Sequence, residues 1–294
     1  MRLTAPDVPT PIRHALVVAS PHDGGALAVG AALRRRLGQS VRVLSPEELV
    51  LSPRWVHAVS DEGDSTETTL ADGLVLRDRE IRFVLCRVRA LSAPHFARSL
   101  PDDRDYAVSE LHALFLSWLA SLPCPVVNRP HAQGLAGRER SPFEWLALAA
   151  RAGLRVRGFS LTTNARRDPC PGWIPHGVAD GVRLWSFDAS PSLPRALLGR
   201  SPTLFLEPIG PPCPRALVVG GDVLGDVPAH VASGCLRLAA SVGCELLEVR
   251  FGTGRGGDLR VTDVTHFPPL EARPEADCVA DWLVSKTTSV SEAA

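Results

Sequence analysis

The sequence predicts an α/β fold in two domains. Short apolar runs typical of buried strands alternate with longer amphipathic segments typical of helices, and the order strand–helix–strand–helix opens the chain. The length of 294 residues fits about two domains or one large one, and a content of 45% hydrophobic and 22% charged residues is that of a globular protein. A chain of this size can bury its core without disulfides or structural metals.

The elements of the first half are predicted from apolar runs, caps and proline stops. In order, they are a strand over 15–19, a turn over 20–25, a helix over 26–37, a strand over 41–44, a helix opened by the capping box Ser45–Glu48, an exposed loop over 61–66 between edge strands, a strand over 81–87 and a strongly amphipathic helix from about 101–105 to Pro123.

The second half is predicted in the same way, and its middle is rich in proline, glycine and arginine. In order, we expect a short strand and turn over 126–130, a helix from the capping box Ser141–Glu144 to Gly153, one short strand over 182–187 within 164–203, strands over 203–209 and 215–219, a helix over 228–242, a strand over 245–251, a hairpin loop over 252–257, a strand over 259–264, a last helix over about 276–284 and a tail from 287.

The charges balance, because Lys+Arg and Asp+Glu both number 32. This neutrality predicts no nucleic-acid partner and no anionic membrane as a partner. Lys286 is the single lysine, so no lysine inside the folded body is available as a Schiff base, general base or phosphate ligand.

The cysteines and the N-terminus predict a reduced, cytoplasmic protein. The seven cysteines form no C-x-x-C pair and their number is odd, which argues against a disulfide framework and against a zinc or iron–sulfur site. Residues 1–13 contain no apolar core of a signal peptide, and no apolar stretch reaches the roughly 18 residues of a membrane span. Four cysteines in or beside apolar runs are expected to be buried: Cys86, Cys124, Cys235 and Cys244.

Local motifs alone do not fix the chemistry. The run Gly252–Gly257 follows a strand, but no helix follows it, so a flexible hairpin is favoured over a phosphate loop. The turn Ser20–Gly25 lies where parallel sheets place ligands, and a structural turn is favoured over a site there too. The histidines show no metal-ligand spacing, and no G-x-S-x-G is present. Asp102 and Asp103 fit the first turn of their helix better than a catalytic pair.

The order of the segments is more informative than any one of them. The chain resembles the ATP-grasp superfamily, in particular the carboxylate–amine ligases that include ribosomal-protein glutamate ligases and enzymes that modify ribosomally made peptides. The segments that carry this resemblance are Arg87, Asp102–Tyr106 with Glu110–Leu114, Pro125–Pro130, Ser141-Pro142 with Ala152–Leu154, Ser160–Asn164, Leu204–Ile209, Arg215–Gly220 and Asp263–Pro268.

The resemblance implies a preATP-grasp, Rossmann-like domain over 1–125 and an ATP-grasp-like domain over 126–286. Within the second domain, residues 163–203 correspond to a lid that is short for the family, and its prolines argue against regular sheet. Residues 287–294 are expected to be a flexible tail. Retained features of the hinge and of the following strand are Glu207, Ile209, Arg215 and Gly220. Glu207 could edge an adenine pocket, although a hinge strand is also needed simply to close the core.

The departures from the family pattern remove the charges that Mg-ATP needs, because phosphoryl transfer depends on cations at the phosphates and carboxylates on magnesium. Ser141 stands where the first phosphate lysine is expected, and 165–200 contains no lysine. The ribose-binding acid falls at Cys213. The magnesium carboxylates fall at Arg250 and Asp263, of which only Asp263 is a possible ligand. The accompanying asparagine is replaced, at position 265, by threonine.

Two main hypotheses follow from the resemblance. The first is a non-catalytic binding or partner subunit with an eroded nucleotide site and no expected cofactor, whose partner is a peptide or protein such as an active ATP-grasp ligase; a homo-oligomer also stays open. The second is an active ligase that forms an amide or peptide-type bond through an acyl phosphate with ATP and Mg²⁺, using Asp263 or Glu248 on the metal. The residues that would bind ATP, arginines in place of lysines included, are Glu207, Arg215, Arg138, Arg140 and Arg183. A third, unrelated enzyme site at 20–25 is the remaining alternative.

Overall fold

The computed structural model describes residues 13–163, 173–180, 183–186, 203–211, 214–254 and 256–291; the strands at 174–180 and 183–186 and residues 287–291 are described by their backbone alone. The chain forms two compact units, Met1–Arg138 with Pro269–Ala294, and Glu139–Pro268. The segment after Pro268 therefore belongs with the N-terminal unit, whereas the sequence analysis placed residues up to 286 in the second domain.

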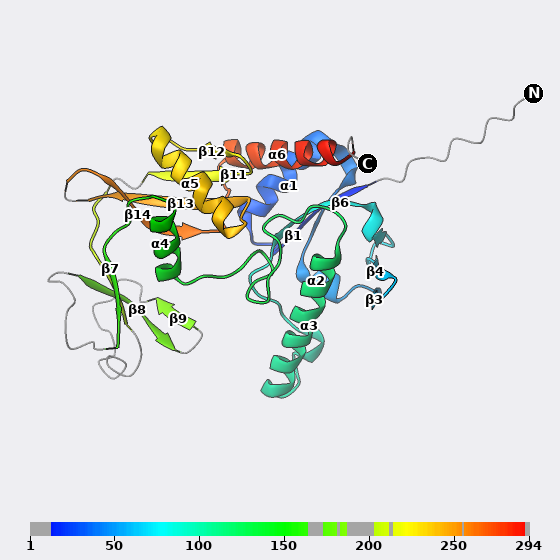
Figure 1. Ribbon diagram of the computed structural model, residues 1–294. Coiled ribbons are helices and arrows are strands. Elements are labelled where there is room, and N and C mark those ends of the chain that lie inside the picture. The colour runs from blue at the N-terminus through cyan, green and yellow to red at the C-terminus, as the bar shows by residue number, and fades with distance from the viewer. Residues whose placement is uncertain are drawn as a thin grey trace, which may run out of the picture. The chain divides into compact units, whose positions relative to one another are not determined.

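The N-terminal unit is built on a parallel sheet of three strands in the order β2-β1-β6 (Figure 1). These strands are β1 (His14–Ala19), β2 (Val41–Leu44) and β6 (Ile81–Arg87), and all three match the predicted positions. Side chains alternate between the two faces of the sheet, so Leu16 and Val84 face one core cluster with Phe115. The predicted strand at 126–130 is reduced to one parallel bridge between Val126 and Val84.

Of the helices in this unit, α2 (Pro46–Val50) begins at the predicted capping box, and α1 (Gly24–Leu37) begins two residues before the predicted 26. Asp23 caps α1, and a complete capping box of Ser45 and Glu48 opens α2. Short 3₁₀ segments are η1 (Gly38–Ser40), η2 (Asp78–Glu80) and η3 (Pro94–Phe96). The long helix α3 spans Pro101–Ser121, close to its predicted span.

A small antiparallel sheet packs against α3. It has the order β3-β4-β5, with β3 (Arg54–Ser60), β4 (Gly63–Thr69) and β5 (Val75–Arg77). Trp55 contacts Phe115 and Trp118 edge-on, with ring centroids 5.1 Å and 5.4 Å apart. His57 joins the two elements, because its ring nitrogens lie 2.8 Å from the hydroxyls of Thr66 and Ser117. The predicted loop over 61–66 is shorter than expected, since the cross-strand pairing starts at Gly63.

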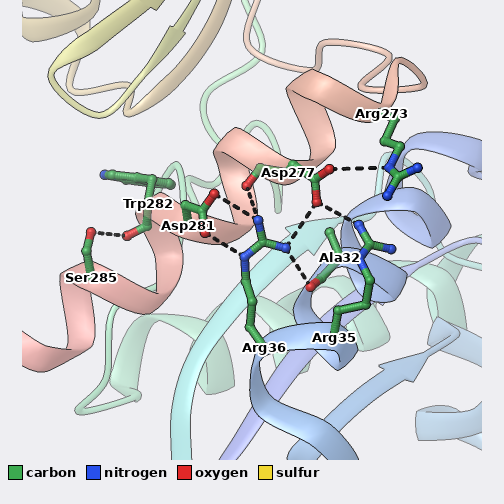
Figure 2. A network of polar contacts seen from close by, with 8 residues as sticks. All are labelled: Ala32, Arg35, Arg36, Arg273, Asp277, Asp281, Trp282 and Ser285. Carbon is green, nitrogen blue, oxygen red and sulfur yellow. Dashed lines mark hydrogen bonds and ion pairs between the residues drawn. The ribbon is translucent and has the colours of Figure 1, made fainter.

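The C-terminal helix α6 (Arg273–Ser291) joins the N-terminal unit through α1 (Figure 2). The Arg36 guanidinium donates to Asp281 at 2.6 Å and to Asp277 at 3.0 Å, and Arg35 donates to Asp277 at 2.6 Å. Beneath these surface ion pairs, Val279 and Leu283 are fully buried. The helix is longer than the predicted 276–284 and covers part of the predicted tail, because its last turns continue through Ser291.

The second unit contains an antiparallel sheet covered on one face by two helices. The order is β12-β11-β13-β14, with β11 (Arg215–Val219), β12 (Asp222–Leu224), β13 (Leu246–Thr253) and β14 (Leu259–Thr265). The covering helices are α4 (Pro142–Arg151) and α5 (Ala229–Val242), which share one core cluster with this sheet. The predicted hairpin loop loses Gly252 and Thr253 to β13.

A second antiparallel sheet in this unit has the order β7-β10-β8-β9. Its strands are β7 (Phe159–Thr162), β8 (Ile174–Asp180), β9 (Arg183–Ser186) and β10 (Thr203–Leu206). Only β9 was predicted between 164 and 203, because the prolines argued against sheet. β8 accommodates Pro175 beside an irregularity, where the register with β10 shifts between Leu204 and Phe205. None of the helices in the described part of the chain is long and apolar enough to cross a membrane.

Candidate functional site

Strand pairing gathers the retained and substituted site residues on one face of the β11–β13–β14 sheet. Arg215 pairs with Arg250, and Arg250 pairs with Asp263 on the next strand. The alternate residues Val249 and Phe251 are buried in the core below, so Arg250 and Glu248 lie on the opposite face. The candidate site is therefore a polar strip across three neighbouring strands.

A buried carboxylate lies at the centre of this strip. Glu248 has 0% exposed surface. Its Oε1 accepts a hydrogen bond from Nε of Arg250 at 2.6 Å, and its Oε2 accepts one from Nη1 of Arg215 at 3.2 Å. Both guanidinium groups are partly exposed, with side-chain exposures of 47% and 39%. A buried charge needs such partners, and here the chain supplies two cations of its own.

The predicted magnesium ligand Asp263 lies beside a cation instead of beside a second carboxylate. It is exposed on β14, opposite Arg250. The pKa of Arg250 is raised, first by its hydrogen bond to Glu248 and further by the charges of Glu248 and Asp263, while desolvation opposes the rise. Magnesium requires clustered oxygen ligands, and a guanidinium among them repels it. The residues of this strip therefore do not fit a magnesium ion.

The hinge residue Glu207 is already engaged by three parts of the second unit. Its carboxylate Oε2 accepts hydrogen bonds from the Gly158 N–H and from Nη1 of Arg260, both at 2.9 Å. Its backbone carbonyl accepts from the guanidinium of Arg157, and its N–H donates to the Gly158 carbonyl at 2.9 Å. The main-chain and side-chain groups that could edge an adenine ring are thus bonded within the protein.

The chain beyond Glu207 closes against the sheet. Pro208 has no N–H to offer a base. The Ile209 side chain approaches Gly252 so closely that a Cβ at Gly252 would lie 2.2 Å from its Cγ2. Gly210 pairs with Thr253 in an isolated bridge. The hinge is therefore packed onto β13, which supports the structural role that the sequence left open for Glu207.

Arg157, which binds the Glu207 carbonyl, is more buried than Arg250 and Arg260. Desolvation lowers its pKa, and the charges of Glu207 and Asp263 oppose this lowering. Neither Arg157 nor Arg260 was predicted as a site residue, because neither falls at a motif position. A signal that could have identified them is the presence of arginines in or beside strands that otherwise face a core, since such arginines need carboxylate partners.

The other predicted ATP-binding residues lie elsewhere or outside the described residues. Arg140 stacks over Trp145, with its guanidinium carbon 4.9 Å from the ring centroid, and donates to the Val242 carbonyl at 3.5 Å. It is therefore placed at the C-terminal end of α5. Ser141 forms the complete capping box with Glu144, as predicted. Arg183 lies on β9, but its side chain falls outside the described residues, and Cys213 falls outside them altogether. Arg138 donates to Gln133 at 3.0 Å.

The two loop motifs carry no assembled chemistry. In the turn over 20–25, the Asp23 carboxylate accepts hydrogen bonds from the Ala26 N–H at 2.9 Å and from the Arg87 guanidinium at 2.8 Å. Asp23 therefore caps α1 and forms an ion pair with the buried Arg87. The side chain of Arg87 is 4% exposed. In the glycine loop, Gly254 and Asp258 close the β13–β14 hairpin through backbone hydrogen bonds, as the hairpin prediction expected.

The described residues hold no metal cluster, and four of their cysteines are buried. No group of three His, Cys, Asp or Glu side chains there could hold a metal ion. Cys86, Cys124, Cys235 and Cys244 are buried and free, as predicted. Burial raises the pKa of Cys86 and Cys124 to about 12, so their thiolates are suppressed.

A cavity of about 500 Å³ lies on the other face of the same sheet. Its floor is apolar, with Leu154, Val231 and Phe251, and Arg155 and Asp258 stand at its rim. His230 also lines this cavity, which is separate from the polar strip.

Comparisons with known proteins identify the fold. No family model and no curated protein sequence matches the chain. Among solved structures, a Chryseobacterium gregarium RiPP-associated ATP-grasp ligase, in complex with ADP and a leader and core peptide, matches at 13% identity over 94% of this chain and 97% of that one, with a TM-score of 0.71.

Two further structures agree. The ATP-grasp ligase PsnB, complexed with minimal precursor, Mg and ADP, matches at 22% identity over 93% of this chain and 98% of that one, with a TM-score of 0.68. The macrocyclase MdnC from Microcystis aeruginosa MRC, bound with precursor peptide MdnA, matches at 15% identity over 92% and 99%, with a TM-score of 0.67. The chain therefore has the fold of these ATP-grasp ligases, and both the α/β class and the fold that the resemblance implied are confirmed.

Proposed function

We propose that this chain is an ATP-grasp-fold binding or partner subunit that does not ligate with its own Mg-ATP site. The single observation that carries the proposal is the state of Glu248. This buried carboxylate has Arg250 on one oxygen and Arg215 on the other, so it is neutralised without a metal. A divalent cation would have to displace a guanidinium from each oxygen of Glu248 that it used, against the repulsion of both arginines.

The hinge supports the same proposal. The carboxylate of Glu207 accepts hydrogen bonds from Gly158 and Arg260, and its carbonyl accepts one from Arg157. An adenine ring would have to compete with these internal hydrogen bonds, and an exchange of one such bond for another yields little net free energy. The nucleotide is therefore disfavoured at its base as well as at its phosphates.

The partner is proposed to be a peptide or a protein. The structures that share this fold include ligases solved with leader, core or precursor peptides. Binding of a peptide, or of an active ATP-grasp ligase, is the function that the retained fold can serve without Mg-ATP.

Calorimetric titration with ATP, in the presence and absence of Mg²⁺, tests the proposal. The expected result is that magnesium does not strengthen ATP binding to the natural chain. Arg250→Glu replaces the inhibiting cation with a carboxylate beside Asp263, so this variant should gain magnesium dependence. Arg151→Glu makes the same chemical change at an exposed position of α4 and should gain none. Tight, magnesium-dependent ATP binding by the natural chain would refute the proposal.

The active ligase is the second candidate, and one observation favours it. Arg215 and Arg250 lie on one polar face with the exposed Asp263, and arginine binds phosphate well. In this case the chain, supplied with ATP and Mg²⁺, would release ADP in the presence of a peptide that bears a carboxylate and of an amine. Asp263→Asn would abolish the release. ADP release that survives Asp263→Asn would contradict this candidate.

A further inference from the structure

The N-terminal half of α3 exposes a face that nothing in the described part of the chain covers. The C-terminal half of α3 is held in the core by Phe115, Trp118 and Leu119. In contrast, residues 101–106 are all exposed, and so are 109, 110 and 113. Of these positions, 102, 103, 106, 109, 110 and 113 recur at helical spacing and form a continuous stripe. Figure 1 shows α3 running away from the β2-β1-β6 sheet.

Tyr106 lies in the middle of this stripe with three carboxylates around it. Its side chain is 68% exposed and is the single tyrosine of the chain. Asp102 and Asp103 precede it by four and three residues, and Glu110 follows it by four, so all three lie next to it on the helix surface. Among the described residues, no salt bridge joins these carboxylates to a cation. Arg104 lies two positions before Tyr106, on the opposite side of the helix.

Large exposed apolar side chains also lie at the start of the helix. Leu100 is 71% exposed and Phe96 is 44% exposed. We define the α3 face as Phe96, Leu100, Asp102, Asp103, Tyr106 and Glu110. Isolated exposed apolar residues are ordinary, but aromatic and aliphatic groups gathered within eleven positions around unpaired carboxylates are typical of a binding surface.

We propose that the α3 face is a docking site for an arginine-bearing segment of a partner polypeptide. A guanidinium can stack on the Tyr106 ring and at the same time donate to the carboxylates of Asp102, Asp103 or Glu110. An apolar neighbour in the partner segment would cover Leu100 and Phe96. The site lies wholly in the N-terminal unit, so this inference stands or falls independently of nucleotide binding by the second unit.

The charges favour such a partner over the other occupants. A second copy docking through the same face would bring three carboxylates against three, because a two-fold interface is self-complementary. Nucleic acids and anionic membranes would meet the same repulsion. Helix stabilisation does not account for the cluster either. Asp102 and Asp103 complement the helix dipole in the first turn, but Glu110 lies beyond it.

The single tyrosine makes a site-specific test possible. The probe is a short synthetic peptide that repeats the order Arg-Leu-Leu-Arg, and its control carries citrulline in place of arginine, which removes the charge and keeps the shape. Tyrosine nitration, read by mass spectrometry, reports on Tyr106 alone. The expected result is that the arginine probe protects Tyr106 and the citrulline peptide does not. Equal nitration with and without the arginine probe would overturn the proposal.

Matched variants separate this site from general charge attraction. We expect Tyr106→Ala to weaken probe binding, measured by fluorescence anisotropy, by about fivefold. The triple change Asp102→Asn, Asp103→Asn and Glu110→Gln should weaken it further. The control triple change Asp61→Asn, Glu62→Gln and Asp64→Asn removes the same charge from the exposed β3–β4 turn. It should leave the affinity unchanged.

Two outcomes would overturn the docking site. If the control triple variant weakens binding as much as the α3 triple variant does, the attraction is non-specific. If light scattering shows that the chain alone forms a dimer that Tyr106→Ala dissociates, then the occupant is a second copy. Because every substituted side chain is exposed, circular dichroism of each variant should match that of the natural chain, which keeps loss of folding apart from loss of docking.

Discussion

The Nε atom of Arg250 lies 2.6 Å from Oε1 of Glu248, whose side chain has no exposed surface. An ordinary surface ion pair contributes little, because water screens both partners. In this pair the carboxylate is buried and the guanidinium is partly exposed. The guanidinium therefore offsets the free-energy cost of burying the carboxylate. The same pair removes a carboxylate from the oxygen ligands that a metal could use.

Removal of Arg250 is expected to destabilise the second unit. Arg250→Ala should lower the free energy of unfolding by about 1–3 kcal/mol, because a buried carboxylate oxygen loses its donor. In the background of Glu248→Gln, the same substitution should cost less, since an amide carries no charge that needs neutralising. Urea denaturation of the four proteins of this double-mutant cycle measures the difference. Equal costs in both backgrounds would contradict the proposed dependence of Glu248 on Arg250.

The burial of Asp78 predicts a pH dependence of stability. Desolvation raises the pKa of Asp78 above its ordinary value of 3.8, although hydrogen bonds from Thr66 oppose the rise. The folded chain therefore binds more protons than the unfolded chain between 3.8 and the raised value, and stability falls as pH rises through this window.

Asp78→Asn should abolish this contribution while still accepting the hydrogen bond from the Thr66 N–H. Relative to the natural chain, the variant should gain stability as pH rises above 3.8, by about 1.4 kcal/mol for each unit of pKa shift. Urea titrations from acidic to neutral pH measure the gain, with the exposed Asp61→Asn as a control. A difference between variant and natural chain that stays constant with pH would contradict the prediction.

Two adjacent glycines are predicted to differ sharply in their tolerance of a methyl group. A Cβ at Gly25 would lie 1.7 Å from the Pro269 carbonyl oxygen, whereas a Cβ at Gly24 would meet nothing closer than 3.7 Å, at Glu271. Gly25→Ala should therefore destabilise the N-terminal unit by about 1–3 kcal/mol or more, and Gly24→Ala should be close to neutral. Thermal unfolding of both variants decides the matter, and equal melting temperatures would rule out the close approach.

The attachment of α6 to α1 should depend on salt. Arg36 donates to both Asp277 and Asp281. Hydrogen bonds from Arg35 and then from Arg36 lower the pKa of Asp277, and the hydrogen bond from Arg36 lowers the pKa of Asp281. Because the pairs are exposed, salt screens them. Arg36→Ala should speed amide hydrogen exchange in α6 at low salt and have a smaller effect at high salt, where the buried Val279 and Leu283 still hold the helix. Arg273→Ala, in which the lost pair is 3.6 Å long and 82% exposed on the arginine side, is the matched control.

Apolar periodicity and capping residues were sufficient to predict the architecture, and they failed where long-range contacts decide. The strands at β1, β2 and β11 and the capping box at Ser141 follow from local pattern. β8 was missed because Pro175 argued against it, and only the pairing partner β10, with its shifted register, makes room for that proline. The end of α6 was misjudged because its partner, α1, lies at the other end of the sequence.

The candidate site shows the same division. The resemblance already indicated the loss of cationic and acidic positions, such as the arginine at 250 in place of a magnesium carboxylate, and the retention of Asp263. What could not be predicted was how the remaining charges would pair, because Glu207 meets Arg260 across more than fifty positions of sequence. Arg157 has no motif position and is recognised only from its contact with the Glu207 carbonyl.

The two-part make-up of the N-terminal unit has a consequence for synthesis on the ribosome. Its sheet and α1 leave the ribosome first, but α6 follows only after the whole of Glu139–Pro268. Until then, the side of α1 that receives α6 is exposed to water and to other nascent chains. The N-terminal unit is therefore the first to be synthesised and the last to complete its folding. Truncation within α6 would damage this unit, while the unit Glu139–Pro268 could still fold.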